Sequence, residues 1–236
     1  MMTQENENHS PFLEWLGAWE EGLSPLDLAE AVDDPGRAAI VSEDLLKGFC
    51  HVGPLASERA ARIVPAVVRL FQRAHALGLR HFLLFQDTHE PGAVEFSAYP
   101  PHCVEGTEES ETIDELQNLP FSDLFTVLPK NAISSSVGTG LESWLSEHPD
   151  VDTFIVVGVC TDICVYQAAV HLRVRANVLG QDDARIIVPA DAVETFDTPV
   201  EVAQEIGAMP HDGDLLHRVF LYHMALNGIE VVSRIV

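Results

Sequence analysis

The run "DTFIVVGVC" (152–160) constrains the fold more than any other stretch of this chain. From Phe154 to Val159 it is apolar apart from one glycine, so it lacks the polar–apolar alternation of a strand with one face in water. It passes directly into "TDICVYQAAVHLRVRA" (161–176), which has the composition of a helix. A strand that is apolar on both faces and leads straight into a helix is typical of a parallel sheet covered on both sides.

The same alternation of strand and helix signals runs through most of the chain. Further strands are predicted at "RAAIVSED", "RHFLLFQD", "DLFTVLPK", "ARIIVPADA" and "IEVVSRI". Helices are predicted at "SERAARIVPAVVRLFQRAHALGL", where Gly78 is the stop signal, and at "GLESWLSEH" and "DGDLLHRVFLYHMALNG". We therefore predict an α/β fold: a single doubly wound domain over 37–236, with a mainly parallel sheet and helices on both faces. Residues 1–36 are expected to form an N-terminal extension, disordered over about the first ten residues and then folded into short helices.

Composition limits the partners of such a domain. The 236 residues, 47% of them hydrophobic, suffice for the core of one α/β domain. With 13 basic and 37 acidic residues the formal net charge is −24, which repels phosphate backbones and anionic lipid, so we expect neither nucleic acid nor a membrane as partner. No apolar run reaches transmembrane length, and "MMTQENENHS" has no signal-peptide pattern, so a cytoplasmic location is expected. The four cysteines are expected to be reduced: Cys50, Cys103, Cys160 and Cys164.

Side chains that can take part in catalysis follow four predicted strands. Asp44, Asp87 and Lys130 end the first three strands, and Cys164 lies one helical turn beyond the fourth. Ligands of open parallel sheets bind beyond the carboxyl ends of the strands, so these residues should converge on one crevice. Each has an ordinary explanation alone, as a turn residue, a surface lysine or a core cysteine. Together they supply the base, the cation and the thiol that nucleophilic catalysis requires.

Cys164 is the candidate nucleophile. Its predicted place at a helix N-terminus should supply partial positive charge and lower the pKa of its thiol. Burial in the core is the alternative reading. A redox couple with Cys160 is a further alternative, which the strand-to-helix turn disfavours because it directs the two side chains differently.

The loop "FQDTHEPGAVEFSAYPPHCVEGTEES" (85–110) carries candidate metal ligands. Asp87 and His89 follow a strand at i and i+2, and two prolines stiffen the approach to His102. Carboxylate and imidazole groups suit Zn²⁺, Fe²⁺ or Mn²⁺, although a hydrogen-bonded polar loop would also explain the pattern. Cys103 adjoins His102, and neighbouring side chains rarely reach one metal. Eight further histidines are expected on the surface or on helix faces: His51, His75, His81, His148, His171, His211, His217 and His223.

Four motifs together resemble the isochorismatase-like cysteine hydrolases, and within them the nicotinamidases. They are "DLLKGF", "DTH…YPPHCVEGT", "LPK" and "GVCTDICV", and the resemblance extends over roughly Ala38 to Val236. "YPPHC", "CTDICV" and "ETFDTP" are most similar to the plant-type nicotinamidases. The resemblance implies a triad in which Asp44 is the base, Lys130 the cation and Cys164 the nucleophile. It implies conversion of nicotinamide to nicotinate and ammonia through a cysteine thioester.

The resemblance also implies the rest of the site. The Val159–Cys160 peptide should be cis, with the backbone N–H groups of Cys160 and Cys164 forming an oxyanion hole. Phe49 and Tyr99 match positions that sandwich the substrate ring. One divalent metal is implied, most often zinc, with manganese or iron as other choices, and it holds the pyridine nitrogen as a template. Glu95 stands where many relatives have a third histidine, so the predicted ligand set is Asp87, His89, Glu95 and His102.

Some features depart from the family pattern and keep other functions open. Thr88 stands between the first two ligands in place of the common tryptophan, and "LGQDDAR" (179–185) resembles an extension. The same triad could act on another small amide, such as a carbamoyl or ureido compound. A catalytically silent metal-binding protein of this fold is a third reading, which the intact triad disfavours. The sequence leaves homo-oligomerisation open.

Overall fold

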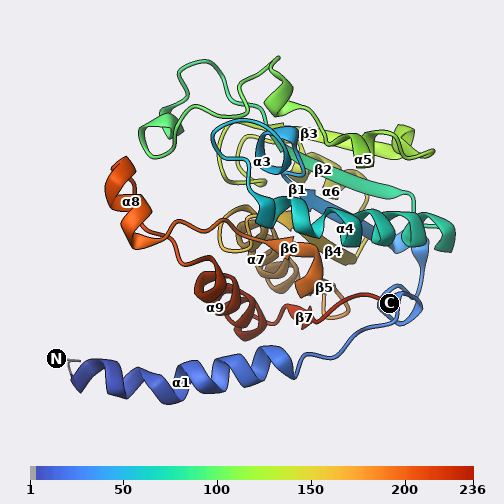
Figure 1. The fold of residues 1–236 in the computed structure, drawn as a ribbon. Helices are drawn as coiled ribbons and strands as arrows, with labels where there is room; N and C mark the ends of the chain where they lie inside the picture. The colour runs from blue at the N-terminus through green and yellow to red at the C-terminus, as the bar shows by residue number, and fades with distance from the viewer. Residues whose placement is uncertain (1–3) are drawn as a thin grey trace.

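The computed structural model describes residues 4–236 and contains one parallel sheet (Figure 1). The strands are β1 (Ala38–Glu43), β2 (His81–Asp87), β3 (Phe125–Lys130), β4 (Thr153–Val159), β5 (Arg185–Pro189), β6 (Val193–Glu194) and β7 (Glu230–Val232). Their order is β3-β2-β1-β4-β5-β7, and the short β6 pairs with β4. Every pairing is parallel. The chain enters at the centre of the sheet and winds outward in both directions, which confirms the predicted doubly wound α/β fold.

Helices cover both faces of this sheet. Figure 1 shows α4 (Glu58–Leu77) in front of the strands and α6 (Leu141–Glu147) and α7 (Cys164–Leu179) behind them. On β1, Ala38 and Ile40 belong to the core beneath α4, whereas Ala39 and Val41 belong to the core beneath α6, α7 and α9 (Gly213–Leu226). Both faces of the central strands are therefore buried, as the unbroken apolar runs predict.

The ends of α4 follow from local sequence signals. The Ser57 side chain accepts a hydrogen bond from the Arg59 N–H and caps the first turn. Gly78 ends the helix in the left-handed conformation, with φ +114°, which glycine adopts at little cost. The predicted extent of this helix is confirmed.

The N-terminal region differs from the short helices expected there. A single 18-residue helix, α1 (Gln4–Glu21), runs beside α9 along one edge of the molecule (Figure 1). The Trp19 and Tyr222 rings pack with centroids 5.7 Å apart, and Arg218 pairs with Glu20 at 2.6 Å. One long helix therefore stands where short helices were expected, stabilised by contacts with α9, and the expectation of disorder over about the first ten residues stays a prediction. Residues 1–3 lie outside the described part of the chain.

Short elements connect these parts. They are α2 (Leu28–Ala31), α3 (Lys47–Cys50), α5 (Asp114–Gln117), α8 (Val200–Ile206), η1 (Pro35–Arg37), η2 (Val94–Ser97), η3 (Glu108–Ser110), η4 (Ser122–Leu124) and η5 (Ala190–Ala192). Over residues 4–236, no helix has the length and apolar character needed to cross a membrane.

Gly158 allows β1 and β4 to approach closely at the carboxyl end of the sheet. It has φ +113° and is in register with Glu43, and a Cβ there would lie 2.0 Å from the Glu43 carbonyl oxygen. We expect Gly158→Ala to lower the free energy of unfolding by more than about 3 kcal/mol, measured by urea denaturation, because the backbone must move. Gly92→Ala is the matched control: its φ is +89° with no atom within 4 Å, so it should cost only about 1–2 kcal/mol. Equal losses in the two variants would contradict the close-approach explanation.

Candidate active site and metal centre

The topology of the sheet brings four side chains together. Asp44 follows β1, Asp87 and Lys130 end β2 and β3, and Cys164 begins the helix after β4. Asp87 and Lys130 are register partners on adjacent strands. All four side chains are buried. The convergence expected from the strand ends is present in the structure.

The Lys130 ammonium lies between these groups. Its Nζ is 2.8 Å from Asp44 Oδ2 and 3.7 Å from Cys164 Sγ. It also forms an ion pair with Asp87 Oδ1. Burial alone would lower the pKa of Lys130, but the nearby Asp44, Cys164 and Asp87 raise it well above its ordinary value. The side chain is therefore a permanent buried cation.

Asp44 is held in an unusual backbone conformation. Its φ is +52°, in the left-handed region where aspartate is enriched among non-glycine residues. The carboxylate Oδ1 accepts a hydrogen bond of 2.8 Å from the Asp87 N–H. Burial and the neighbouring Asp87 raise the pKa of Asp44 to about 6, against the opposing effect of Lys130. A carboxyl group that titrates near neutral pH is suited to exchanging protons.

Cys164 is the first residue of α7, as its predicted helix-terminal position requires. Burial raises the pKa of its thiol well above the ordinary value, and Asp44 and Asp87 raise it further, while Lys130 lowers it. The lowered pKa predicted from helix position is therefore wrong, because desolvation and two acids outweigh the favourable charges. The resting thiol keeps its proton and needs a base to become a nucleophile.

The turn before Cys164 has the predicted backbone geometry. The Val159–Cys160 peptide is cis. The Cys160 carbonyl accepts hydrogen bonds from the Ile163 and Val165 N–H groups, each at 3.1 Å. Among the turn, loop and cap hydrogen bonds of residues 4–236, the N–H groups of Cys160 and Cys164 are not donors. Two amides free to bind an oxygen are consistent with the predicted oxyanion hole, which stays a prediction.

Three of the four predicted metal ligands form one buried group. One ligand atom each from Asp87, His89 and His102 lies within 4.8 Å of the others. Asp87 Oδ2 is 3.5 Å from His89 Nε2 and 3.6 Å from His102 Nε2. Ligands at about 2.1 Å from a tetrahedral metal are separated by about 3.4 Å, so the spacing fits a divalent cation.

The hydrogen bonds around the two imidazoles support the same conclusion. His102 Nδ1 lies 2.8 Å from the Pro100 carbonyl, and His89 Nδ1 lies 3.4 Å from Asn131 Oδ1. Both Nε2 atoms are thus directed at Asp87, and His89 Nε2 is buried without a hydrogen-bond partner. Outer contacts of this kind orient metal-binding histidines, and an unpartnered buried nitrogen is costly unless a ligand completes it.

Glu95 lies outside this group. Its half-buried carboxylate accepts a hydrogen bond of 3.1 Å from the Ile133 N–H. The fourth predicted ligand is therefore not brought to the other three, and its role stays a prediction. Cys103 is also outside: it is buried, and a Cβ on Gly48 would lie 2.7 Å from its Sγ, so the sulfur packs against that glycine.

Aromatic rings surround the His102 imidazole. The ring centroids of Phe49 and Tyr99 lie 5.7 Å and 6.2 Å from it. Phe96, which the sequence reasoning did not single out, lies 5.7 Å from His102 and 5.3 Å from His89. Its position between the predicted ligands, in a loop with few aromatic residues, is the signal that could have identified it.

Two of the histidines expected on the surface or on helix faces form hydrogen bonds to the turn before Cys164. His211 Nε2 lies 2.8 Å from Asp162 Oδ2, and His217 Nδ1 lies 2.8 Å from Thr161 Oγ1. Both imidazoles are largely buried. The partners are about fifty residues apart in the chain, so no local pattern indicates the contact.

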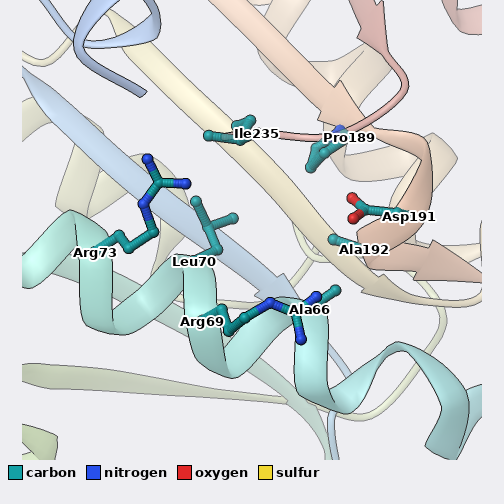
Figure 2. A pocket seen from close by; sticks show the side chains of 8 residues that line it. All are labelled: Ala66, Arg69, Leu70, Arg73, Pro189, Asp191, Ala192 and Ile235. Atoms are coloured by element: carbon teal, nitrogen blue, oxygen red, sulfur yellow. The ribbon is translucent and has the colours of Figure 1, made fainter. Parts of the chain in front are cut away.

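A small hollow beside α4 is separate from this site. It has a volume of about 60 Å³ and lies between α4 and η5 (Figure 2). Arg69, Arg73 and Asp191 line it, and it contains none of the residues described above.

Comparison with known families adds independent information. The model of the isochorismatase domain family matches residues 38–213 of this chain. Nicotinamidase 1 of Arabidopsis thaliana is 34% identical over 212 residues, covering 83% of this chain and 85% of that protein.

Solved structures share the fold. The N-carbamoylsarcosine amidase of Thermoplasma acidophilum has a TM-score of 0.61 at 26% identity, covering 83% of this chain and 95% of its own. A pyrazinamidase of Pyrococcus horikoshii, solved in complex with zinc, has a TM-score of 0.64 at 20% identity, covering 84% and 99%. At that identity the second structure supports the fold alone.

The geometry of the metal group leads to a direct test. We expect His102→Ala to lower affinity for Zn²⁺ by at least about a hundredfold, because it removes an atom from a three-ligand group. The control is His171→Ala, the same change at a helix-face histidine that pairs with Glu142. Competition of each purified protein with a zinc chelator measures the affinity. Equal affinities for the two variants would show that the group does not hold the metal.

Proposed function

This chain belongs to the isochorismatase family, and we propose that it is a metal-dependent amidohydrolase that converts nicotinamide to nicotinate and ammonia. The observation that carries the proposal is the position of Lys130. Its ammonium contacts the candidate base Asp44 and the thiol of Cys164, and also Asp87 of the metal group. One buried cation therefore contacts both the candidate nucleophile and the metal group, which would bind the ring nitrogen of the substrate.

The first chemical step is activation of the thiol. Asp44 accepts the proton of Cys164, and Lys130 stabilises the negative charge as it moves from carboxylate to sulfur. The raised pKa of the thiol makes this transfer necessary, and the pKa of about 6 for Asp44 leaves the acid ionised and ready to accept a proton near neutral pH.

The thiolate of Cys164 then attacks the carboxamide carbon, and the carbonyl oxygen takes the negative charge. The N–H groups of Cys160 and Cys164 are the proposed donors to that oxygen. The C–N bond breaks as Asp44 returns its proton to the leaving nitrogen, which departs as ammonia. Water, deprotonated by Asp44, hydrolyses the thioester and restores the thiol.

Asp87, His89 and His102 are the proposed metal ligands. A bound divalent cation would supply a Lewis acid that holds the pyridine nitrogen and so orients the ring. Phe49, Tyr99 and Phe96 lie around His102, where they could pack against a flat heteroaromatic ring. Zinc is the proposed metal, and a ligand set rich in carboxylate would let manganese or iron compete.

Glu95 is the proposed fourth ligand. The carboxylate is close enough for its charge to raise the pKa of His89, along with the nearer Asp87 and against the effect of burial. Rotation away from the Ile133 N–H would free it to coordinate. In the chelator competition described above, Glu95→Ala should then lower zinc affinity by at least about tenfold.

Hydrolysis of a carbamoyl or ureido amide is the second candidate function. It is favoured by the shared fold and 26% identity with the N-carbamoylsarcosine amidase. The buried Asp-His-His group argues for nicotinamide, since a non-pyridine amide has no ring nitrogen for a metal to bind. We further propose that 37–236 is the hydrolase domain and that the protein is cytoplasmic, where its four free cysteines would stay reduced.

Ammonia release from nicotinamide tests the proposal. We expect the zinc-loaded protein to release it and Cys164→Ala to lower kcat by at least about a thousandfold, because the nucleophile is lost. Cys160→Ala is the matched control and should keep most of the activity, since only its backbone is proposed to act. Turnover of N-carbamoylsarcosine without turnover of nicotinamide would favour the second candidate, and equal losses in the two cysteine variants would remove Cys164 from the mechanism.

A further inference from the structure

Glu43 is a buried acid that the proposed mechanism does not use. It is the last residue of β1, directly before Asp44, and its exposed fraction is 0%. Its Oε1 accepts a hydrogen bond of 2.6 Å from Ser135 Oγ. Its Oε2 is buried and has no partner among the described residues. An ionised carboxylate with one hydroxyl donor would be poorly compensated in such a place.

The surroundings keep this acid neutral. Burial raises the pKa of Glu43 to about 8, with Asp44 also raising it and Lys130 and Ser135 opposing. At neutral pH the side chain is therefore mainly a carboxylic acid. An oxygen without a hydrogen-bond partner costs less free energy in a buried neutral carboxylic acid than in a buried ionised carboxylate.

Ser135 lies in the segment 131–140, which connects β3 to α6. Only 1% of Ser135 is exposed, although most of its neighbours in the segment are partly or fully exposed. The Thr139 hydroxyl donates a hydrogen bond to the Ser135 carbonyl, so the two halves of the segment are tied at this residue. Glu43 is the group that anchors that point to the sheet.

The same segment supports the metal group from its other end. Asn131 Oδ1 accepts a hydrogen bond of 3.1 Å from the Glu90 N–H and lies 3.4 Å from His89 Nδ1. The Ile133 N–H donates to Glu95. A displacement of 131–140 would therefore disturb these contacts with His89 and with the loop that carries the candidate ligands. It would also shift Lys130, which directly precedes the segment.

We propose that Glu43 is a positioning residue whose carboxyl group fixes Ser135 and thereby holds the segment 131–140 against the catalytic edge of the sheet. In that position Asn131 orients His89 and Lys130 keeps its place between Asp44 and Cys164. The inference rests on the proposed function for its catalytic consequence, but the bracing contact itself does not. Because the acid is neutral, an uncharged amide can replace it.

Four variants test this role. Glu43→Gln keeps an acceptor for Ser135 and the neutral state, Glu43→Ala removes the acceptor, and Ser135→Ala removes the donor. Ser136→Ala is the matched control: it lies next to Ser135, and among residues 4–236 its side chain hydrogen-bonds only to Ser134. Hydrogen exchange of the 131–140 amides measures how firmly the Glu43–Ser135 contact holds this segment. The kcat and KM for nicotinamide measure the effect of that contact on catalysis.

We expect Ser135→Ala and Glu43→Ala to speed exchange of the 131–140 amides by about tenfold or more and to lower kcat by a similar factor, with KM changing less. Glu43→Gln and Ser136→Ala should stay within about threefold of the parent. Ser135→Ala loses only a hydroxyl, so it decides the matter if Glu43→Ala does not fold. Parent-like exchange in Ser135→Ala, or a loss in Glu43→Gln as large as in Glu43→Ala, would overturn the proposal. A parent protein that does not hydrolyse nicotinamide would refute the proposed function. The hydrogen-exchange result would then still test whether the Glu43–Ser135 contact holds the segment.

The neutral acid also predicts a pH dependence of stability. Between its ordinary pKa of 4.5 and about 8, Glu43 binds a proton in the folded chain and not in the unfolded one, so its contribution to stability falls as pH rises through this window. The groups whose charge acts on Glu43 are Asp44, Asp87 from β2, Lys130 from β3 and Cys164 from α7. Glu43→Gln removes this proton linkage and keeps the other groups. The Tm of Glu43→Gln minus that of the parent should therefore rise by several degrees from about pH 5 to about pH 8. A difference that is constant with pH would contradict a neutral Glu43.

Discussion

The site depends on one buried ammonium group. Lys130 Nζ contacts Asp44, Asp87 and Cys164, and its side chain is fully buried from solvent. A buried cation is stable only where acids compensate it, and buried acids need a cation in turn. Removing either side would leave uncompensated charge at the centre of the sheet edge. The same contacts that make Lys130 stable also place a base, a thiol and a metal ligand within reach of one another.

The parallel sheet is what makes this arrangement available. Strands β3, β2, β1 and β4 are adjacent, so residues from four distant parts of the chain end at one edge. The close approach of β1 and β4 at Gly158 brings the turn that precedes Cys164 beside Glu43 and Asp44. Segments that follow the strands then supply the remaining contacts. The register of the strands therefore sets the positions of the candidate catalytic side chains. Contacts with the sheet hold the connecting segments in place.

Strand ends and motif spacing were enough to predict the doubly wound fold, the meeting of Asp44, Lys130 and Cys164, and three members of the metal group. These features depend on periodicity and on topology, which sequence patterns express directly. The raised pKa of the Cys164 thiol could not be predicted, because helix position is local and desolvation depends on the whole site. The single helix over 4–21 and the burial of His211 depend on contacts far along the chain. Such contacts leave no local pattern.

The three acids near Lys130 ionise in a fixed order, which burial, the neighbouring charges and the hydrogen-bond partners together determine. Asp87 has Lys130 and two imidazoles, which hold its pKa below the usual range even though burial would raise it. Asp44 has the lysine and one backbone N–H, and its pKa is about 6. Glu43 is fully buried and has only the hydroxyl of Ser135 as a hydrogen-bond donor among residues 4–236, and burial raises its pKa to about 8 in spite of Lys130. Near neutral pH the proton therefore stays on Glu43, which leaves Asp87 charged for a metal and Asp44 charged for the thiol. A third negative charge beside Cys164 would oppose formation of the thiolate, so the poor solvation of Glu43 favours the chemistry next to it.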